Sequence, residues 1–353
     1  MSAPPPPPAA PAGPGPGPAK AFLLAAGLGT RLRPLSLELP KPAWPLFDVP
    51  LAACALDLLA LAGVTQAVVN LHHLPQRLRD ALAPWIPAGV EVRWSHEPEI
   101  LGTGGALLAW RGFLSTGPFF LANADTYQEI DFGAMARRHR EAGVVATLSL
   151  RRLPPGAPGP IEVDGAGRIV RFLGARAPGC GPGAPCAFTG VHVLAPELLG
   201  ELPERPHCIN ADVHQGLVGR GAELAGFFPE EGSFWSDLGT PERYLGAHWE
   251  LLRRGRLPAA SPGRIVAEDG EAAGGGRFSA PCYLGPGAAV EGRAVAGPFA
   301  VLGAGARVGA GARVESSVLW AGARVEGEEL RRAILSCSGA RMTGQPAAAG
   351  QEG

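Results

Sequence analysis

The sequence contains very little lysine. Lys20 and Lys41 are the two lysines, and all the other members of the 31 basic residues are arginine. The basic residues nearly balance the 32 acidic ones, so the formal net charge is −1. A chain without strong positive charge has no general surface for nucleic acid or for an acidic membrane. We therefore expect neither as a partner, and we expect any anion site to be local.

Paired cysteines and long apolar runs are also lacking. The six cysteines form no CxxC pair, which favours free thiols in a cytoplasmic protein over disulfides. No stretch reaches the roughly 18 uninterrupted apolar residues of a membrane span. Residues 1–19, "MSAPPPPPAAPAGPGPGPA", have neither the basic start nor the apolar segment of a signal peptide. Their proline and glycine density predicts a disordered tail.

Strand and helix patterns alternate after this tail. Buried strands are expected at "AFLLAAG", "QAVVNLH", "VEVRWSHE", "PFFLANAD" and "VVATLSLRR", and helices are expected over 51–63, 75–85, 104–114 and 132–143. Such alternation predicts an α/β domain over 20–255 with a Rossmann-like, mixed and mostly parallel sheet. Ligands of these sheets bind at the carboxyl ends of the strands, so Gly27 to Arg33 and Asn123 to Asp125 should share one rim.

A repeat of six residues begins beyond residue 255, where the composition changes to glycine, alanine and valine. Aliphatic side chains recur at Leu284, Val290, Ala296, Leu302, Val308 and Val314, and the spacing slips after Val318. This hexapeptide pattern predicts a parallel β-helix over 256–340, followed by a flexible tail over 341–353. The last histidine is His248, so the repeat has no base for acyl transfer. We interpret it as a structural unit for oligomerisation or regulation.

The first strand leads into a cationic, glycine-bearing loop, "AAGLGTRLRPLSLELPKP" (25–42). Its GxG alone is weak, because it lacks both the third glycine of a dinucleotide fingerprint and the GK[ST] of a P-loop. A structural tight turn is the alternative. However, the amides of Gly27 to Thr30 can form an anion nest, and Arg31 and Arg33 can neutralise phosphate oxygens. Prolines on both sides of Lys41 stiffen the backbone that aims its ammonium group.

Two carboxylates are candidate metal ligands. Asp125 ends an apolar strand, and Asp237 precedes a Gly-Thr-Pro turn. A buried carboxylate costs free energy unless a cation meets it, and Mg²⁺ takes one or two carboxylates plus phosphate oxygens. A helix cap or a turn is the alternative for each of them. Together with the cationic loop, the pair favours a magnesium site.

Five segments in this order resemble the successive signatures of sugar-phosphate nucleotidyltransferases. They are "AAGLGTRLRPL…PKP", "EPEILGTGGALL", "FLANAD", "FTGVHVL" and "FWSDLGTPERYL". The resemblance covers residues 20 to 335, and the trailing repeat looks like the left-handed β-helix that many members carry. The first segment looks most like mannose-1-phosphate guanylyltransferases, with uridylyl- and thymidylyltransferases acting on glucose or amino-sugar 1-phosphates close behind.

The resemblance implies a reaction in which a sugar 1-phosphate attacks the α-phosphorus of an NTP, so that an NDP-sugar and pyrophosphate form. It implies catalytic roles for Arg31, Lys41 and Asp125, and magnesium binding by Asp125 and Asp237. The implied nucleotide-binding residues are Ala26, Gly27, Leu28, Gly29, Thr30, Arg31, Gly102 and Thr103. The implied sugar-phosphate-binding residues are Gly105, Asn123, Thr189 and Gly190, to which we add Arg176 as a substitute for a family lysine. The partners are then an NTP and a sugar 1-phosphate, with a homo-oligomer formed through the β-helix.

The chain departs from the family pattern in two places. Ala124 stands where the family usually has glycine, in an NGD triplet. Relatives often carry a lysine that grips the sugar phosphate, and because the corresponding region "RFLGARAPG" has none, Arg176 is the proposed substitute. A regulatory subunit without catalysis is a second hypothesis, although the loop Arg and Lys and the metal Asp that it should lose are present. A dinucleotide-dependent oxidoreductase is disfavoured by the missing glycine.

Histidines offer weaker candidates. His72 and His73 follow a strand end, and satisfied loop histidines are the commoner case. His207, Cys208, Asp212 and His214 resemble a zinc cluster, but a polar loop that leads into a helix explains them as well.

Overall fold

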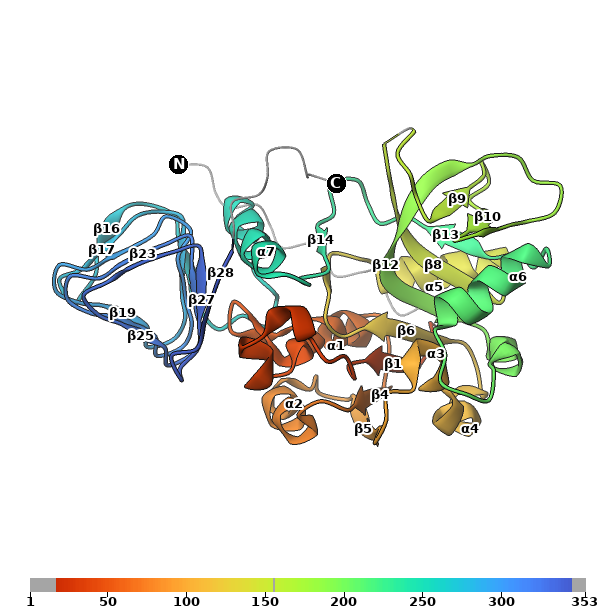
Figure 1. The fold of residues 1–353 in the computed structure, drawn as a ribbon, viewed down its shortest axis with the longest axis horizontal. Coiled ribbons are helices and arrows are strands. Elements are labelled where there is room, and N and C mark those ends of the chain that lie inside the picture. The colour runs from red at the N-terminus through yellow and green to blue at the C-terminus, as the bar shows by residue number, and fades with distance from the viewer. Residues whose placement is uncertain (1–16, 155, 345–353) are drawn as a thin grey trace.

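The computed structural model describes residues 17–154 and 156–344. Most of the tails expected over 1–19 and 341–353 therefore lies outside the described residues. The described chain forms two regions in sequence order: a sheet flanked by helices, and then many short strands, coloured blue in Figure 1. The second region extends slightly beyond the expected boundary, because β28 (Arg341–Thr343) pairs with β27 (Ala333–Leu335).

The first region is built on one ten-stranded sheet. Its strands are β1 (Lys20–Leu24), β4 (Gln66–Leu71), β5 (Glu91–His96), β6 (Phe119–Asn123), β8 (Ala146–Arg152), β9 (Ile161–Val163), β10 (Ile169–Phe172), β11 (Ala175–Arg176), β12 (Ala184–Leu194) and β13 (Ala225–Phe227). β6, β1, β4 and β5 are neighbours in that order and run parallel, whereas β12 runs antiparallel to β6, β8 and β9. The expected α/β class, with a mixed and mostly parallel N-terminal sheet, is confirmed.

The central strands β1 and β6 are buried on both faces of the sheet. Side chains alternate between the two faces along a strand, so neighbouring residues pack in different cores. In β1, Phe22 packs in one hydrophobic core, and Ala21 and Leu23 pack in a second core on the other side. A strand that is buried on both faces must be apolar throughout. The run "AFLL" is thereby explained.

Helices cover the sheet. They are α1 (Leu51–Leu61), α2 (Pro75–Leu82), α3 (Gly102–Gly105), α4 (Arg111–Leu114), α5 (Phe132–Ala142), α6 (Gln215–Gly219) and α7 (Pro241–Arg253). Thr240 caps α7, as its hydroxyl oxygen accepts from the amide of Arg243 at 3.3 Å. The expectation of one helix over 104–114 is wrong, because α3 ends at Gly105 and a 3₁₀ turn precedes α4. No helix within the described ranges is long and apolar enough to cross a bilayer.

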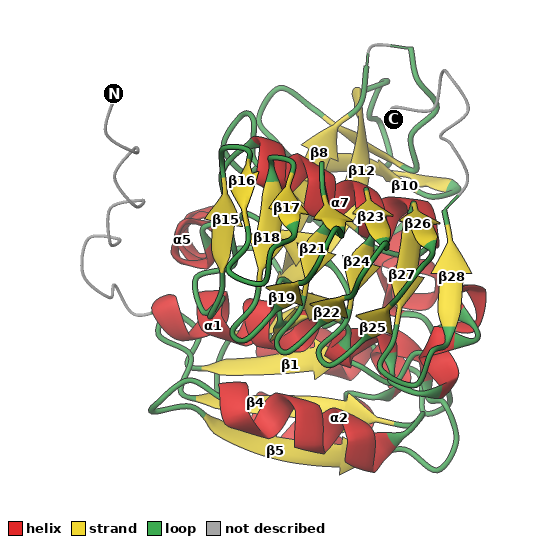
Figure 2. Cartoon of the chain, turned by 90° about the vertical axis from the view of Figure 1, so that its left-hand side faces the viewer, coloured by secondary structure: helices red, strands yellow, loops and turns green. Residues whose placement is uncertain are grey.

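The second region consists of short strands in three ladders, which are parallel apart from three antiparallel pairs at their ends. They are β15 (Arg264–Val266), β16 (Gly270–Glu271), β17 (Arg277–Phe278), β18 (Cys282–Leu284), β19 (Ala289–Val290), β20 (Val295–Ala296), β21 (Val301–Leu302), β22 (Arg307–Val308), β23 (Arg313–Glu315), β24 (Val318–Leu319), β25 (Arg324–Val325), β26 (Glu329–Arg331), β27 and β28. Each central strand pairs in parallel with the third strand after it, so that β18, β21, β24 and β27 form one ladder. Figure 1 shows these ladders around a three-sided outline, and Figure 2 shows their strands side by side.

The register of the ladders follows the hexapeptide spacing. Leu284 pairs with Leu302, three hexapeptides later, and Leu302 pairs with Leu319, one residue short of three hexapeptides. This shorter step matches the expected slip of the repeat. The aliphatic residues of the repeat share one interior core.

A small hairpin joins the two regions. Its strands are β2 (Pro45–Leu46) and β3 (Val49–Pro50), and both turn residues, Phe47 and Asp48, have positive φ, 52° and 70°. Two positive φ values are what a tight two-residue hairpin turn requires. They place Asp48 against the coil of short strands, where its carboxylate accepts from the amide of Ala304 at 2.8 Å and from the hydroxyl of Tyr283 at 3.0 Å.

Aromatic rings reinforce this joint. Trp44 lies with ring centroids 5.1 Å from Tyr244 of α7 and 5.1 Å from Trp320 of the coil, both edge to face. The indole N–H of Trp320 donates to the Tyr244 oxygen at 3.2 Å, and the Tyr244 hydroxyl donates to the Pro45 carbonyl. The two regions therefore share a buried polar and aromatic contact.

Candidate active site

Most of the predicted phosphate-binding loop lines one cavity of about 330 Å³ at the carboxyl ends of β1 and β6. The cavity is lined by Leu28, Gly29, Thr30, Arg31, Leu32, Lys41, Ile100, Asp125 and Gly239. The structure thus brings together predicted residues of the loop, Leu28 to Arg31 and Lys41, with Asp125 from a distant segment of the chain. Ala26 and Gly27 belong to the same loop but do not line this cavity.

Backbone geometry explains one of the two loop glycines. Gly29 has φ 59°, and a Cβ there would lie 3.3 Å from the Cβ of Ser36, so a side chain is disfavoured by conformation and by space. A Cβ at Gly27 would meet no protein atom within 4 Å. The requirement for glycine at Gly29 is thus structural, whereas the protein itself does not impose one at Gly27.

Lys41 lines the cavity with a buried side chain. Its ammonium Nζ donates to the Asp125 carboxylate at 2.9 Å and to the backbone carbonyl of Asp237 at 2.5 Å, and its side chain is 8% exposed. Pro40 fixes the extended backbone from which the 3₁₀ turn of Lys41 starts. One ammonium group therefore ties the loop to both predicted metal ligands.

The carboxylate of Asp237 has its own cationic partner. Burial would raise its pKa, but hydrogen bonds from the Arg243 guanidinium and the Gly239 amide, together with the charges of Arg243 and Lys41, hold the pKa below its usual value. The guanidinium of Arg31 lies against Gly239, where a Cβ would come within 2.9 Å of its Nη2. Asp237 is therefore ionised at neutral pH beside three basic side chains.

The donor set fits a magnesium ion that is bound together with phosphate. Asp125 and Asp237 flank Lys41, and their side chains are 37% and 31% exposed. Among the described residues, no three His, Cys, Asp or Glu side chains gather as a metal site. Two carboxylates that leave room for water and phosphate oxygens are typical of Mg²⁺ rather than of a metal held wholly by protein.

The glycine segment 102–105 lies against another part of the chain instead of lining the cavity. The amide of Gly104 donates to the carbonyl of His207 at 3.1 Å, and the amide of Ile209 donates to the Thr103 hydroxyl at 2.9 Å. A Cβ on Gly102 would lie 2.4 Å from the His207 carbonyl oxygen, and one on Gly104 would lie 2.2 Å from its ring nitrogen. Close packing by His207 thus accounts for these glycines.

The predicted sugar-side residues form a second group next to Asp125. A Cβ on Gly190 would lie 3.0 Å from the amide nitrogen of Asn123, which explains a glycine with φ 101° at that position. The Thr189 hydroxyl is buried against Ser149, to whose Oγ it donates at 2.7 Å. Only the carbonyl of Thr189 faces the neighbouring segment, where it accepts from the indole N–H of Trp235 at 2.7 Å.

Arg176 is placed apart from these groups. Its guanidinium donates to Glu162 at 2.8 Å and to the Gly181 carbonyl at 2.7 Å. The amide of Gly183, Arg176 and Arg171 overcome the effect of burial and lower the pKa of Glu162 to about 2. The charge of Arg176 is therefore compensated within its own hairpin.

His72 and His73 have structural partners in the backbone. His72 Nδ1 lies 2.8 Å from the Glu97 carbonyl, and His73 Nε2 lies 2.7 Å from that of Ser36. Asp212 accepts from Arg205 and from the amide of Cys208, consistent with a polar loop. A π-helical turn over Ile209–His214 follows.

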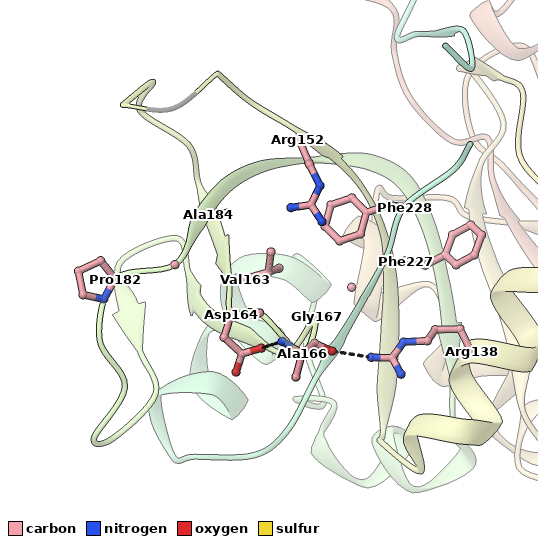
Figure 3. Close-up of a pocket in the computed structure, with 13 residues that line it drawn as sticks. Arg138, Arg152, Val163, Asp164, Ala166, Gly167, Pro182, Ala184, Phe227 and Phe228 are labelled. Atoms are coloured by element: carbon pink, nitrogen blue, oxygen red, sulfur yellow. Dashed lines mark hydrogen bonds between the residues drawn. The ribbon is translucent and has the colours of Figure 1, made fainter. Parts of the chain in front are cut away.

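A larger cavity of about 700 Å³ lies elsewhere, between the β9–β10 turn and β13 (Figure 3). Arg138, Arg152 and Phe228 are among its lining residues, and none of the predicted site residues lines it. Size alone therefore does not identify the site. The smaller cavity is the better candidate because it concentrates the charges of Arg31, Lys41 and Asp125.

Two basic residues near the site were missed by sequence reasoning. Arg243 contacts Asp237 because the Thr240 cap turns the first turn of α7 back onto the loop, and the "DLGTPER" segment contains that signal. Arg151 lies over the ring of Trp235, with its guanidinium carbon 5.1 Å from the ring centroid. No local sequence pattern connects Arg151 with Trp235, because the two come into contact only in the folded chain.

Comparison with known proteins places the chain in a family. Residues 20–254 match the sequence model described as "Nucleotidyl transferase". Zebrafish (Danio rerio) mannose-1-phosphate guanylyltransferase catalytic subunit beta is 29% identical over 259 residues, 70% of this chain and 68% of that protein. Mannose-1-phosphate guanylyltransferase of Mycobacterium tuberculosis is 28% identical over 311 residues, 86% of this chain and 80% of that protein.

A solved structure supports the same fold. The crystal structure of HddC from Yersinia pseudotuberculosis matches with a TM-score of 0.52 and 23% identity, covering 65% of this chain and 97% of that chain. Because the family match spans well over half of the sequence and coincides with the region that carries the cavity, the chain belongs to the nucleotidyl transferase family of enzymes.

Proposed function

We propose that this protein transfers a nucleotidyl group from an NTP to a sugar 1-phosphate and releases pyrophosphate, with GTP and mannose 1-phosphate as the favoured pair. The observation that carries the proposal is the contact of Lys41 Nζ with both Asp125 and the Asp237 backbone, in a cavity lined by Gly29 to Arg31. The choice of pair is supported by the names of the relatives.

The reaction needs positioning and charge neutralisation rather than a protein nucleophile. An oxygen of the sugar phosphate forms the new bond to the α-phosphorus, and the bond to the leaving pyrophosphate breaks. Backbone amides of Gly27 to Thr30 would bind the triphosphate, and the open space at Gly27 lets phosphate oxygens approach the backbone. Arg31 would stabilise charge on the leaving pyrophosphate, and Lys41 would hold the transferring phosphate.

Asp125 and Asp237 would hold magnesium, which when bound supplies charge neutralisation at the phosphate oxygens. Arg243 keeps Asp237 ionised, so that the carboxylate is ready for a cation at neutral pH. Asn123, Gly190 and the Thr189 carbonyl would border the sugar. Gly102 and Thr103 would act on the nucleotide side and Gly105 on the sugar side, by shaping the backbone that packs against the segment of His207.

For the second region we propose a left-handed parallel β-helix over 256–340, following a catalytic domain over 20–255. The three parallel ladders and their shared aliphatic core support this assignment. We further propose that the β-helix mediates homo-oligomerisation and that the enzyme works in the cytoplasm, where sugar phosphates and NTPs are available.

Two alternatives share the same scaffold. A uridylyl- or thymidylyltransferase acting on glucose or amino-sugar 1-phosphates would use the same phosphate loop, because the base is selected by a few hydrogen bonds. A non-catalytic regulatory subunit that binds nucleotide sugar would have no need for Arg31, Lys41 and Asp125 together in one cavity.

A substrate matrix tests the proposal. Five NTPs are each combined with mannose, glucose and N-acetylglucosamine 1-phosphates in the presence of Mg²⁺, and pyrophosphate release is measured. We expect the highest kcat/KM for GTP with mannose 1-phosphate. A higher value for UTP or dTTP with another sugar would replace the substrate assignment, and no release from any pair would favour the regulatory subunit.

A further inference from the structure

A cation without a compensating charge lies beside the sugar-side residues. Arg151, near the end of β8, has its guanidinium carbon 5.1 Å from the ring centroid of Trp235. Its Nε atom is buried without a hydrogen-bond partner, and within the described residues no carboxylate pairs with it. A partly desolvated guanidinium without an anion costs free energy that a bound anionic group would offset.

Trp235 connects this cation to the proposed sugar site. The indole N–H of Trp235 donates to the carbonyl of Thr189 at 2.7 Å, and β14 (Trp235–Ser236) pairs with β7 (Tyr127–Gln128), which follows Asp125. Trp235 also precedes Asp237 by two residues. The Trp235 ring that Arg151 covers thus lies between Thr189, a proposed sugar-binding residue, and the segments of Asp125 and Asp237.

The sugar-side residues connect Thr189 to the segment that carries Asp125. Gly190 follows Thr189 and packs directly on the side chain of Asn123, two residues before Asp125. The series of contacts from Arg151 therefore reaches Asn123, two residues before the carboxylate that contacts Lys41.

We propose that Arg151 binds an anionic oxygen group of the sugar substrate. This is the role that the sequence analysis assigns to Arg176. This inference rests on the proposed function. Arg176 is already paired with Glu162, whereas Arg151 has a stacked and oriented guanidinium with no acidic partner. The anionic group has two possible sources: the 1-phosphate itself, or a second anionic substituent on the sugar, such as a carboxylate.

The neighbouring residue offers a matched control. Successive side chains of a strand point to opposite faces, so Arg152 faces away from Arg151. Its guanidinium lies 4.2 Å from the ring centroid of Phe228 and lines the separate larger cavity, as Figure 3 shows. Arg152→Ala therefore removes the same type of side chain, stacked on an aromatic ring in the same way, without touching the proposed sugar site.

The test compares initial rates of the wild type, Arg151→Ala, Arg151→Gln, Arg152→Ala and Arg176→Ala with three sugar substrates. These are mannose, glucose and glucuronic acid 1-phosphates. We expect both Arg151 variants to raise the KM for sugar phosphate by about tenfold or more, the scale of a lost charge-assisted hydrogen bond. The KM for the NTP and the melting temperature should stay close to those of the wild type. Arg152→Ala and Arg176→Ala should leave the sugar-phosphate KM within about twofold.

The three substrates distinguish the source of the anionic group. A loss with all three sugars identifies the 1-phosphate, and a loss confined to glucuronic acid 1-phosphate identifies the second substituent. An unchanged sugar-phosphate KM in folded Arg151→Gln would overturn the inference, as would a loss in Arg176→Ala alone.

Direct titration of each sugar 1-phosphate into the protein by calorimetry separates this inference from the proposed function. If the wild type releases no pyrophosphate but binds a sugar phosphate that Arg151→Gln does not bind, the enzyme assignment fails and the role of Arg151 stands. If the wild type binds none of the three, the role of Arg151 fails as well.

Discussion

In the second region, equivalent leucines such as Leu302 and Leu319 pair with each other along one ladder. In the sheet region, Lys41 contacts Asp125 and the Asp237 carbonyl, and no other described residue makes this pair of contacts. The coil is held together by a core in which equivalent aliphatic side chains stack. Apolar strands stabilise the sheet region too, but its candidate active site depends on individual contacts between residues far apart in the sequence. A periodic sequence specifies the first kind of order, and only the folded chain reveals the second.

Replacement of Lys41 should give the largest loss of activity, because it removes the side chain that contacts both Asp125 and the Asp237 carbonyl. Lys41→Ala deletes the ammonium group that meets Asp125 and the Asp237 carbonyl, and we expect kcat/KM to fall by roughly 10²- to 10³-fold, the scale of losing one preorganised charge. Steady-state pyrophosphate release measures this. The other lysine is the control, since Lys20 contacts Phe113 and Thr116 at the opposite end of β1. Equal losses in Lys20→Ala and Lys41→Ala would refute the special role of Lys41.

Truncation of the coil core tests whether its turns are equivalent. Leu302→Ala and Leu319→Ala each empty a fully buried position in one ladder, and each should lower the free energy of unfolding by about 2–5 kcal/mol. Denaturant titration of both variants gives the comparison. The two losses should agree within about 1 kcal/mol, because the two side chains are equally buried and are paired in the same ladder. A severalfold difference between them would show that the repeat is not uniform.

Acid should destabilise the sheet region specifically, because the second region contains no histidine. Burial lowers the pKa of His192 and of His248 to about 4, so each is neutral in the folded protein and gains a proton first in the unfolded chain. Their stabilisation is complete above the unfolded pKa of about 6.5 and is lost progressively as pH falls toward 4, by up to ~1.4 kcal/mol per pH unit for each.

Denaturant titrations at pH 7 and pH 5 measure this acid effect. The window above pH 5 lies above the range in which most carboxylates titrate, so histidine protonation dominates it. His248→Asn should flatten the dependence relative to the wild type. A wild-type free energy of unfolding that is the same at both pH values would contradict the neutral, buried state of these histidines.

The smallest expected effect is at the joint between the two regions. Asp48→Asn keeps a side-chain oxygen near Ala304 and Tyr283 but removes the charge that burial already disfavours, as the raised pKa of Asp48 indicates. We expect a change in unfolding free energy of about 1 kcal/mol or less. Asp48→Ala leaves the partly buried amide of Ala304 without its acceptor and should cost about 1–3 kcal/mol, which differential scanning calorimetry resolves. A larger loss in the Asn variant than in the Ala variant would be inconsistent with these contacts.

Much of the fold could be predicted from the sequence because its signals are local. Alternating apolar strands and capped helices predicted the sheet, and the spacing of Leu284, Leu302 and the later slip predicted the ladders. The single helix expected over 104–114 is wrong because the chain leaves α3 after Gly105 and passes through a 3₁₀ turn before α4. The close packing of His207 on Gly102 and Gly104, a hundred residues away in the sequence, could not be predicted from local signals either.

The site was predictable only in part. Arg31, Lys41 and Asp125 belong to motifs at strand ends, and they share the cavity as expected. Arg176 is the sequence's candidate to replace the lysine that relatives often carry, but Glu162, fourteen residues before it, already binds its guanidinium. Arg151 faces Trp235 through a contact that joins β8 to β14, and no spacing along the chain encodes it.

The Trp44, Tyr244 and Trp320 cluster limits how freely evolution or engineering can exchange the two regions. Each region contributes part of one interlocked surface: Trp44 and Tyr244 on one side, Trp320 on the other. A chimera that joins a foreign strand repeat to this sheet region must supply an indole at the position of Trp320. Otherwise it will leave a void against Trp44, three residues after Lys41.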